Sequence, residues 1–244
     1  MSPIDRPIWA TLNSYHASIS VGGPLARRFQ PQFNVFGSPR DDSETALAAF
    51  AALVEPGERV CIMQAPPVIV PPGLAVDKWL QGVQMIATRT LAVPSGDEPI
   101  LTLGEADAAE MFTLARLTEP GPFMARTHSM GRFVGIRLEG RLAAMAGERF
   151  RFPGHTEVSA VCTHPDFRGR GFARRLTATV AAGIQARGEQ PFLQAWKTNE
   201  AAIALYASLG FVMRAAVDVV VLEKRNPADS VASAASTSAR AARC

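Results

Sequence analysis

The chain has 244 residues, 48% of them apolar, with a formal net charge of +3 and a sequence pI of about 9.0. That apolar content is enough for a packed core in one large domain or two small ones. The basic residues are mostly arginine and are scattered along the sequence. This distribution favours an anionic small molecule as ligand and argues against a nucleic-acid partner.

Cysteine and histidine positions exclude several classes of site. Cys61, Cys162 and Cys244 are far apart and odd in number, which argues against a disulfide scaffold or a zinc ribbon and favours a reduced, cytoplasmic setting. The four histidines lack metal-ligand spacing, so we expect no metal. We find no secretory signal and no apolar run near the about 20 residues that span a bilayer, so we expect no membrane partner.

Residues 1–97 are expected to form an N-terminal α/β region. The predicted elements are a short helix near 6–12, an amphipathic helix at 44–54, and strands at 59–64 and 83–89. Ser43 or Asp41 is the N-cap candidate of the second helix, because a short polar side chain accepts from a free amide there. The turn-rich sequence Pro-Ser-Gly-Asp at 94–97 marks our boundary to the next region.

Residues 98–224 are expected to form a second, larger domain. Its predicted elements are a strand at 100–103, a helix at 105–117, a hairpin of 131–138 and 141–150, a strand at 155–164, a helix from 172 to 187, a strand at 191–196, a helix at 200–209, and closing strands at 212–215 and 216–223. Residues 225–244 are rich in Ala, Ser and Arg and nearly lack large apolar groups, so we expect a disordered tail.

The most informative segment runs from Val161 to Ala173, a strand that breaks at a proline and turns into a helix through Arg-Gly-Arg-Gly. Such a turn presents free backbone amides and the positive end of a helix dipole to one point, which suits a phosphate. Positive charge around it comes from Arg168, Arg170, Arg174 and Arg175. A dinucleotide fingerprint would need glycine at position 174, and a P-loop would need Gly-Lys-Ser/Thr, which is absent.

The segment that follows strengthens this interpretation. Apolar residues recur on one helix face at Phe172, Leu176, Val180 and Ile184. Farther on, Asn199 is a strong N-cap candidate for a helix that ends at Gly210, and Tyr206 follows Asn199 by seven residues, so both lie on one face.

Arg168, Gly171 and Ala173 fill the pattern Arg/Gln-x-x-Gly-x-Gly/Ala, and the second helix fits Asn-x-x-Ala-x-x-x-Tyr-x-x-x-Gly-Phe. In this order and spacing the two motifs resemble the signature of the GNAT superfamily of acetyl-CoA-dependent N-acetyltransferases, in its FR47-like branch. The resemblance covers residues 98–224. It implies an α/β (α+β) fold with a mixed, mostly antiparallel sheet flanked by helices, and it leaves residues 1–97 open as a degenerate acetyltransferase half.

In this family two strands splay apart, here 156–164 and 191–196, and the pantetheine arm of acetyl-CoA lies in the split as an added strand would. The resemblance then implies backbone contacts to the arm from Val161 and Thr163, and an N–H of Val161 or Cys162 facing the thioester carbonyl. Asn199 would also contact the arm. The pyrophosphate would be held by the turn that contains Arg168, Gly169, Arg170, Gly171, Phe172, Ala173 and Arg174.

The same resemblance implies the catalytic groups. Tyr206 corresponds to the tyrosine that protonates the departing CoA thiolate, and a phenol pKa of about 10 keeps it protonated at neutral pH. Glu157 is the candidate base that removes the ammonium proton, and strand alternation predicts that Glu157, Ser159 and Val161 share a face. A water relay, His155 and His128 stay open as alternatives to Glu157.

The sequence therefore favours an N-acetyltransferase that transfers the acetyl group of acetyl-CoA to a primary amine through a tetrahedral intermediate. A non-catalytic acyl-CoA-binding module and a nucleotide-binding α/β protein are the alternatives. The expected partners are acetyl-CoA and an amine-bearing acceptor, with a homodimer left open. No motif selects the acceptor, which we expect to be chosen by the loop at 118–131, the hairpin and residues 1–97.

Overall fold

The computed structural model describes residues 2–65 and 67–225. An eight-stranded sheet forms its centre, in the order β4-β11-β5-β10-β9-β8-β7-β6, and a three-stranded antiparallel sheet β1-β2-β3 lies beside it. In the large sheet of the described residues, β9 and β10 pair in parallel and every other neighbouring pair is antiparallel. The predicted fold class, a mixed and mostly antiparallel sheet flanked by helices, is confirmed.

The strands are β1 (Ser20–Gly22), β2 (Ala26–Phe29), β3 (Gly37–Pro39), β4 (Arg59–Gln64), β5 (Ala75–Ala87), β6 (Leu101–Leu103), β7 (Phe133–Leu138), β8 (Arg141–Phe152), β9 (His155–Thr163), β10 (Gln190–Trp196) and β11 (Phe211–Glu223). The α-helices are α1 (Pro7–Leu12), α2 (Glu44–Ala52), α3 (Ala108–Thr118), α4 (Phe172–Ala186) and α5 (Glu200–Leu209).

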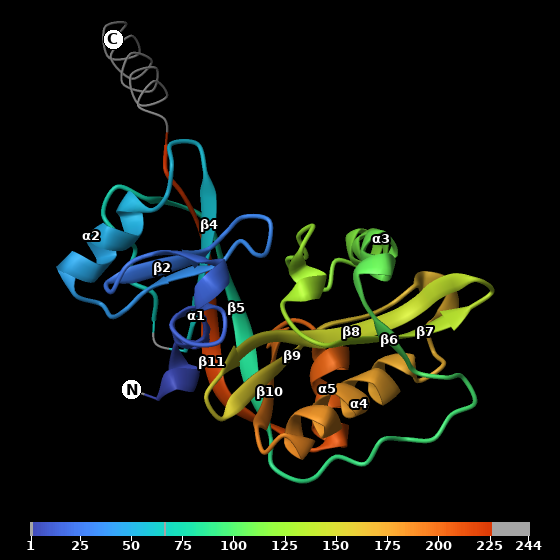
Figure 1. Ribbon diagram of the computed structural model, residues 1–244. Helices are drawn as coiled ribbons and strands as arrows, with labels where there is room; N and C mark the ends of the chain where they lie inside the picture. The colour runs from blue at the N-terminus through green and yellow to red at the C-terminus, as the bar shows by residue number, and fades with distance from the viewer. Residues whose placement is uncertain (1, 66, 226–244) are drawn as a thin grey trace, which may run out of the picture.

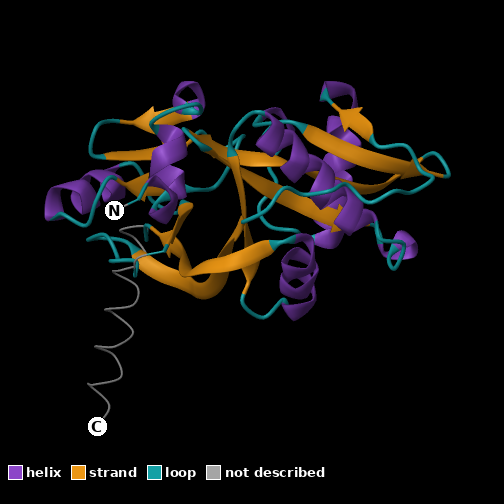
Figure 2. Cartoon of the chain, turned by 90° about the horizontal axis from the view of Figure 1, so that it is seen from below, coloured by secondary structure: helices purple, strands orange, loops and turns teal. Residues whose placement is uncertain are grey.

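Helices cover both faces of the large sheet (Figures 1 and 2). In Figure 1, α4 and α5 lie below β8 and β9, and α3 lies above them. The apolar residues of α4 and α5 share one core cluster with the sheet, whereas α3 packs into a separate cluster with Ala160 and Cys162 of β9. The two faces of β9 can therefore be told apart by which cluster a side chain joins.

The predicted apolar stripe of α4 is confirmed. Phe172, Leu176, Val180 and Ile184 are all buried in the cluster beneath the sheet, and burying each such side chain contributes about 1.5–3 kcal/mol. Arg175 differs from the expectation that it adds charge around the turn, because its guanidinium donates to the carbonyls of Gly96 and Glu98 and to the Glu98 carboxylate. It is buried and pairs with Glu98 at 3.0 Å, so it ties α4 to the segment before β6.

Residues 1–97 share the large sheet with the rest of the chain. β4 pairs with β11, and β5 lies between β11 and β10. The region also has a unit of its own, the three-stranded sheet with α2, whose N-cap Ser43 accepts from the amide of Ala46. The division at residue 97 stays a prediction about domain organisation. The expected tail lies outside the described residues from position 226 onward.

Two strand predictions need correction. The predicted closing strands at 212–215 and 216–223 are one strand, β11, which absorbs an extra residue at a register shift between Met213 and Ala215 instead of turning. The predicted strand at 83–89 begins much earlier, because β5 runs from Ala75 as a long ribbon along β11. The first half of β5 is exposed, so it lacked the apolar alternation that marks a strand.

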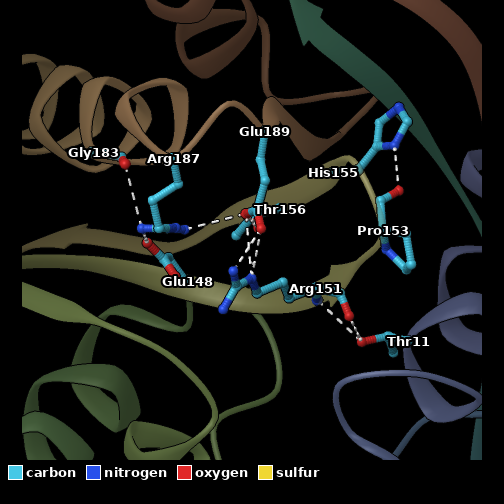
Figure 3. Close-up of polar contacts among 9 residues, drawn as sticks. All are labelled: Thr11, Glu148, Arg151, Pro153, His155, Thr156, Gly183, Arg187 and Glu189. Atoms are coloured by element: carbon cyan, nitrogen blue, oxygen red, sulfur yellow. Dashed lines mark hydrogen bonds and ion pairs between the residues drawn. The ribbon is translucent and has the colours of Figure 1, made fainter.

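A polar network ties β8, β9 and the loop before β10 together (Figure 3). The Glu189 carboxylate accepts from Arg151 Nη2 at 2.6 Å, from the hydroxyl of Thr156 and from Arg187. Arg187 also pairs with buried Glu148 at 3.0 Å. Burial by itself raises the pKa of Glu189, but the hydrogen bonds from Arg151 and Thr156 outweigh it and hold the pKa below its ordinary value.

We expect Glu189→Gln to lower the free energy of unfolding at pH 7 by about 2 kcal/mol, because hydrogen bonds to a charged group contribute about 1.5–3 kcal/mol. The pKa of Glu189 is lower in the folded protein than in the unfolded chain, where a glutamate has a pKa of about 4.3. The stability that this difference contributes is fully present above the unfolded pKa and is lost as the pH falls through the folded pKa. Urea unfolding should therefore show a smaller difference from wild type near pH 4. Glu139→Gln, at an exposed pair with Arg141, is the control, and equal effects of the two substitutions would contradict the prediction.

Candidate active site

The parallel strands β9 and β10 part halfway along their length. They pair from Gln190 with His155 up to Leu193 with Val158, and no pairing between them follows in the described residues. A cavity of about 780 Å³ opens where the strands separate. The predicted splaying of these two strands is confirmed, and it leaves the facing backbone edges available to a ligand.

A β-bulge sits in β9 at the mouth of this split. On β8, Met145 and Gly147 are two residues apart, but their partners Cys162 and Ser159 are three apart, and Ala160 has a positive φ of 52°. The extra residue reverses the alternation of side chains. Val161 therefore packs with the α4 cluster, as Val158 does. The prediction that Val161 shares a face with Glu157 and Ser159 is wrong for this reason.

The turn after β9 has the backbone geometry expected of an anion-binding site. Gly169 and Gly171 both have φ of 78°, a conformation that favours glycine, and Gly171 is the N-cap of α4. A Cβ at either glycine would meet nothing within 4 Å, so the space in front of the amides is open. The first-turn amides of α4 have no intrahelical acceptor. Arg168 and Arg170 are exposed beside them, which suits a pyrophosphate.

Helix α5 brings a phenol to the same cavity. Asn199 caps the helix by accepting from the amide of Ala202 at 3.1 Å, and Gly210 ends it with φ of 109°, as the sequence predicts. Tyr206 lines the cavity, and burial raises the pKa of its hydroxyl to about 12. Burial likewise raises the pKa of the Cys162 thiol to about 11. Both groups are therefore protonated at neutral pH.

The opposite wall contains a buried ion pair. Arg149 of β8 donates from Nε and Nη2 to the two carboxylate oxygens of Glu157, at 2.7 and 2.8 Å. The guanidinium also stacks over Phe150 and Phe36, with its carbon 4.4 and 5.4 Å from the ring centroids. Arg149 borders the cavity and Glu157 lies behind it, 1% exposed. The candidate base is thus a paired carboxylate.

All of the predicted cofactor-binding residues border this one cavity: Val161, Cys162, Thr163, Arg168, Gly169, Arg170, Gly171, Phe172, Ala173, Arg174, Asn199 and Tyr206. The structure thus brings them together, while their individual roles stay predictions. The predicted base Glu157 is not among the lining residues. Arg174 also hydrogen-bonds to Ser208, so α4 and α5 are linked at the cavity rim.

Several lining residues had no signal in the sequence. They are Phe36, Met63 and Gly82 from the first part of the chain, Arg149 on β8, Gln194 on β10, and Val217 and Val219 on β11. They lie far apart in sequence and fit no motif. The pairing of β11 with β4 and β5 brings the residues of those strands to the split, and the pairing of β9 with β8 and β10 brings Arg149 and Gln194 there. Residues 1–97 therefore contribute part of the cavity wall, through Phe36, Met63 and Gly82.

Across residues 2–65 and 67–225, no three His, Cys, Asp or Glu side chains are grouped so that they could hold a metal ion. None of the helices in the described part of the chain is long and apolar enough to cross a membrane.

Comparison with known proteins connects this geometry to a family. The model of the FR47-like protein family matches residues 133–220, and no curated protein matches the chain. A crystal structure from Novosphingobium aromaticivorans DSM 12444, assigned to the GNAT family of acetyltransferases, is 42% identical, with a TM-score of 0.84 over 93% of this chain and 100% of the other.

A second solved structure supports the fold. A GCN5-related N-acetyltransferase from Kribbella flavida is 18% identical, with a TM-score of 0.60 over 91% of this chain and 95% of the other. Identity at this level shows a shared fold and nothing finer. The 42% identity over nearly the whole length of both chains is the stronger finding. This chain belongs to the GNAT family of acetyltransferases.

Proposed function

We propose that this protein transfers the acetyl group of acetyl-CoA to the nitrogen of a primary amine. One observation carries the proposal: the parted strands, the glycine-rich turn at the start of α4 and the Tyr206 phenol all border a single cavity. The turn offers amides and arginines to a pyrophosphate, and the parted strands offer backbone groups to the pantetheine amides.

In the proposed reaction the amine nitrogen attacks the thioester carbonyl carbon, and the C–S bond breaks as the carbonyl re-forms. The backbone N–H of Val161 or Cys162, next to the Ala160 bulge, is the proposed donor to the oxygen that becomes negative. Tyr206 is suited to protonate the sulfur, because a hydroxyl with a pKa of about 12 stays protonated at neutral pH. A thiol has a pKa of about 8.5, so we assign most of the effect of Tyr206 to a hydrogen bond that stabilises the thiolate.

The proton lost by the attacking ammonium needs an acceptor. Glu157 is our proposed base, and because Arg149 separates it from the cavity, a water between them completes the path. We expect Glu157→Gln to lower kcat/KM by about 100-fold or more, because a positioned general base contributes about 10²–10⁴-fold. An unchanged kcat/KM assigns the proton to solvent and removes Glu157 from the mechanism.

The same substitution has a second expected effect. Glu157→Gln leaves the buried Arg149 guanidinium without its counter-charge, so the free energy of unfolding should fall by about 3 kcal/mol. Urea unfolding measures this change. Asp166→Asn removes one partner of the exposed Arg141–Asp166 pair and should cost less than about 1 kcal/mol. If both variants lose the same stability, the Arg149–Glu157 pair is not the structural element that its burial indicates.

Release of free CoA from acetyl-CoA in the presence of a panel of primary amines tests the proposed function. We expect CoA release that depends on the amine and a product whose mass is that of the acetylated amine. Tight binding of acetyl-CoA without turnover of any amine would instead support an acyl-CoA-binding module. Thermal stabilisation by ATP or NAD but not by acetyl-CoA would support a nucleotide-binding protein.

A further inference from the structure

The side chain of Gln194 has hydrogen-bonding capacity that the described residues leave unused. Its Nε2 and Oε1 atoms are both buried, and neither has a partner among residues 2–65 and 67–225. Buried side-chain amides are nearly always hydrogen bonded, so an amide with both ends unpaired calls for an explanation. Because Gln194 borders the cavity, a ligand can be its partner.

Neighbouring residues on β10 show which side of the sheet Gln194 faces. Leu193 and Ala195 pack into the α4 cluster, whereas Phe192 packs on the other face, in the cluster that contains Phe36 and Met63. Strand alternation puts Gln194 on the face of Phe192. Gln194 is also the first residue of β10 beyond its pairing with β9, across from Ser159 and next to the Ala160 bulge. It therefore lies beside the proposed reaction centre, on the face away from α4.

Gln84 provides a comparison, because it is a buried glutamine whose side chain has a structural role. Gln84 lies directly opposite Gln194 on β5 and is fully buried. Its Nε2 donates to the Ile4 carbonyl at 3.0 Å, and its Oε1 accepts from Arg214 at 2.8 Å. The fold thus satisfies both ends of one glutamine and neither end of its strand partner. That contrast indicates that Gln194 serves the cavity and not the packing.

The surroundings limit the chemistry of the ligand. Phe36, Met63 and Val219 give this end of the cavity an apolar wall, and the charges of Arg149 and Glu157 cancel each other. A carboxylate could accept from Gln194 Nε2 but would leave Oε1 facing a negative charge. A carboxamide offers one carbonyl and one N–H, so it can satisfy both atoms at once.

We propose that Gln194 recognises the acceptor, and that the acceptor is an α-amino amide with an apolar side chain, the chemistry found in an aminoacyl amide or at the first residue of a peptide. This inference rests on the proposed acetyl transfer. Gln194 as a whole is partly exposed, so rotation about its side-chain torsions brings the carboxamide to the ligand. The amide of the acceptor pairs with Gln194 while its apolar side chain packs on Phe36 and Met63.

Three amines with the same isobutyl group on the amine-bearing carbon test the proposal: L-leucinamide, L-leucine and 3-methylbutylamine, which lacks the carboxyl carbon. The three amines differ in basicity, so their kcat/KM values cannot be compared directly. The quantity to compare is the ratio of kcat/KM for one amine to that for another, measured at one pH for wild type and again for Gln194→Leu. We expect Gln194→Leu to lower the preference for leucinamide over 3-methylbutylamine at least about tenfold and to leave the Kd for acetyl-CoA unchanged. Its Tm should equal or exceed that of wild type, because the substitution removes an unsatisfied buried amide.

Gln84→Leu is the matched control. It should lower Tm, because it leaves the Ile4 carbonyl without its donor and takes one acceptor from Arg214, whose other partner is Asp5, and it should keep the wild-type preference among the three amines. Gln194→Met gives the same comparison with an unbranched side chain if Gln194→Leu does not fold. Comparing kcat/KM for leucinamide and leucyl-glycinamide in the wild type then tells whether the protein prefers the α-amino amide in a small amide or at the start of a peptide.

Each contrary result has a distinct meaning. If wild type and Gln194→Leu have the same preference among the three amines, Gln194 does not recognise the acceptor. If Gln194→Leu weakens acetyl-CoA binding instead, the carboxamide binds the pantetheine arm and the proposal is overturned. If a wider panel of amines is not acetylated at all, the proposed function fails, which differs from turnover without a preference for the amide.

Discussion

We expect Gly171→Glu to abolish detectable binding of acetyl-CoA, a loss of about 100-fold or more in affinity, which corresponds to about 2.7 kcal/mol. Gly171 caps α4 with φ of 78°, and a Cβ there would meet nothing within 4 Å. The glutamate side chain would therefore extend into the open space before the first-turn amides. Its negative charge would repel the pyrophosphate at the point where the helix dipole attracts it. Calorimetric titration measures the loss.

Two controls separate charge from backbone strain. Gly171→Ala imposes the left-handed strain, about 1–2 kcal/mol, without the charge, and should keep affinity within about tenfold of wild type. Gly188→Glu puts the same side chain at φ of 75° beyond the other end of α4, again with nothing within 4 Å. If Gly171→Glu binds acetyl-CoA as tightly as Gly188→Glu does, the turn is not the pyrophosphate site.

We expect Tyr206→Phe to lower kcat by about 100-fold, within the range of about 10²–10³ that is lost when one hydrogen-bond donor to a developing negative charge is removed. The phenol borders the cavity, and its hydroxyl has no hydrogen-bond partner among the described residues. Losing that hydroxyl therefore costs the fold little. The Kd for acetyl-CoA should change less than about threefold, because the ring and its packing on Phe211 remain. Steady-state kinetics and calorimetry measure the two effects separately.

Tyr15→Phe is the matched control, since the chain has two tyrosines and Tyr15 is exposed beside Arg151. It should leave kcat and Kd unchanged. A pKa of about 12 for Tyr206 also predicts that kcat shows no alkaline limb from this group below about pH 11. Full activity of Tyr206→Phe would remove the phenol from the reaction.

The parts of the site that follow local rules could be predicted from the sequence. The turn at Gly169 and Gly171, the cap at Asn199 and the apolar stripe of α4 each depend on residues within a few positions of one another. Local geometry was therefore enough to predict the turn, the cap and the stripe. The splaying of the two strands was predicted from the resemblance to the GNAT family. The structure confirms the splaying and shows these residues around one cavity.

The parts that depend on distant contacts could not be predicted. The Ala160 bulge reverses the face of Val161, and a bulge depends on the register with β8, which the sequence of β9 alone does not contain. Arg149 and Glu157 are eight residues apart on paired strands, so their ion pair needed that register too. Phe36 and Met63 reach the cavity only because β4 joins the edge of the large sheet beside β11.

A crystal structure of the protein with bound CoA tests most directly whether the parted strands and the glycine turn form one acyl-CoA site. We predict electron density for the pyrophosphate against the amides from Arg168 to Ala173, the pantetheine arm between β9 and β10, and the sulfur within hydrogen-bonding reach of the Tyr206 hydroxyl. Density for the pyrophosphate at another place on the molecule, or a sulfur directed away from Tyr206 and the Ala160 bulge, would contradict both the site and the reaction proposed for it.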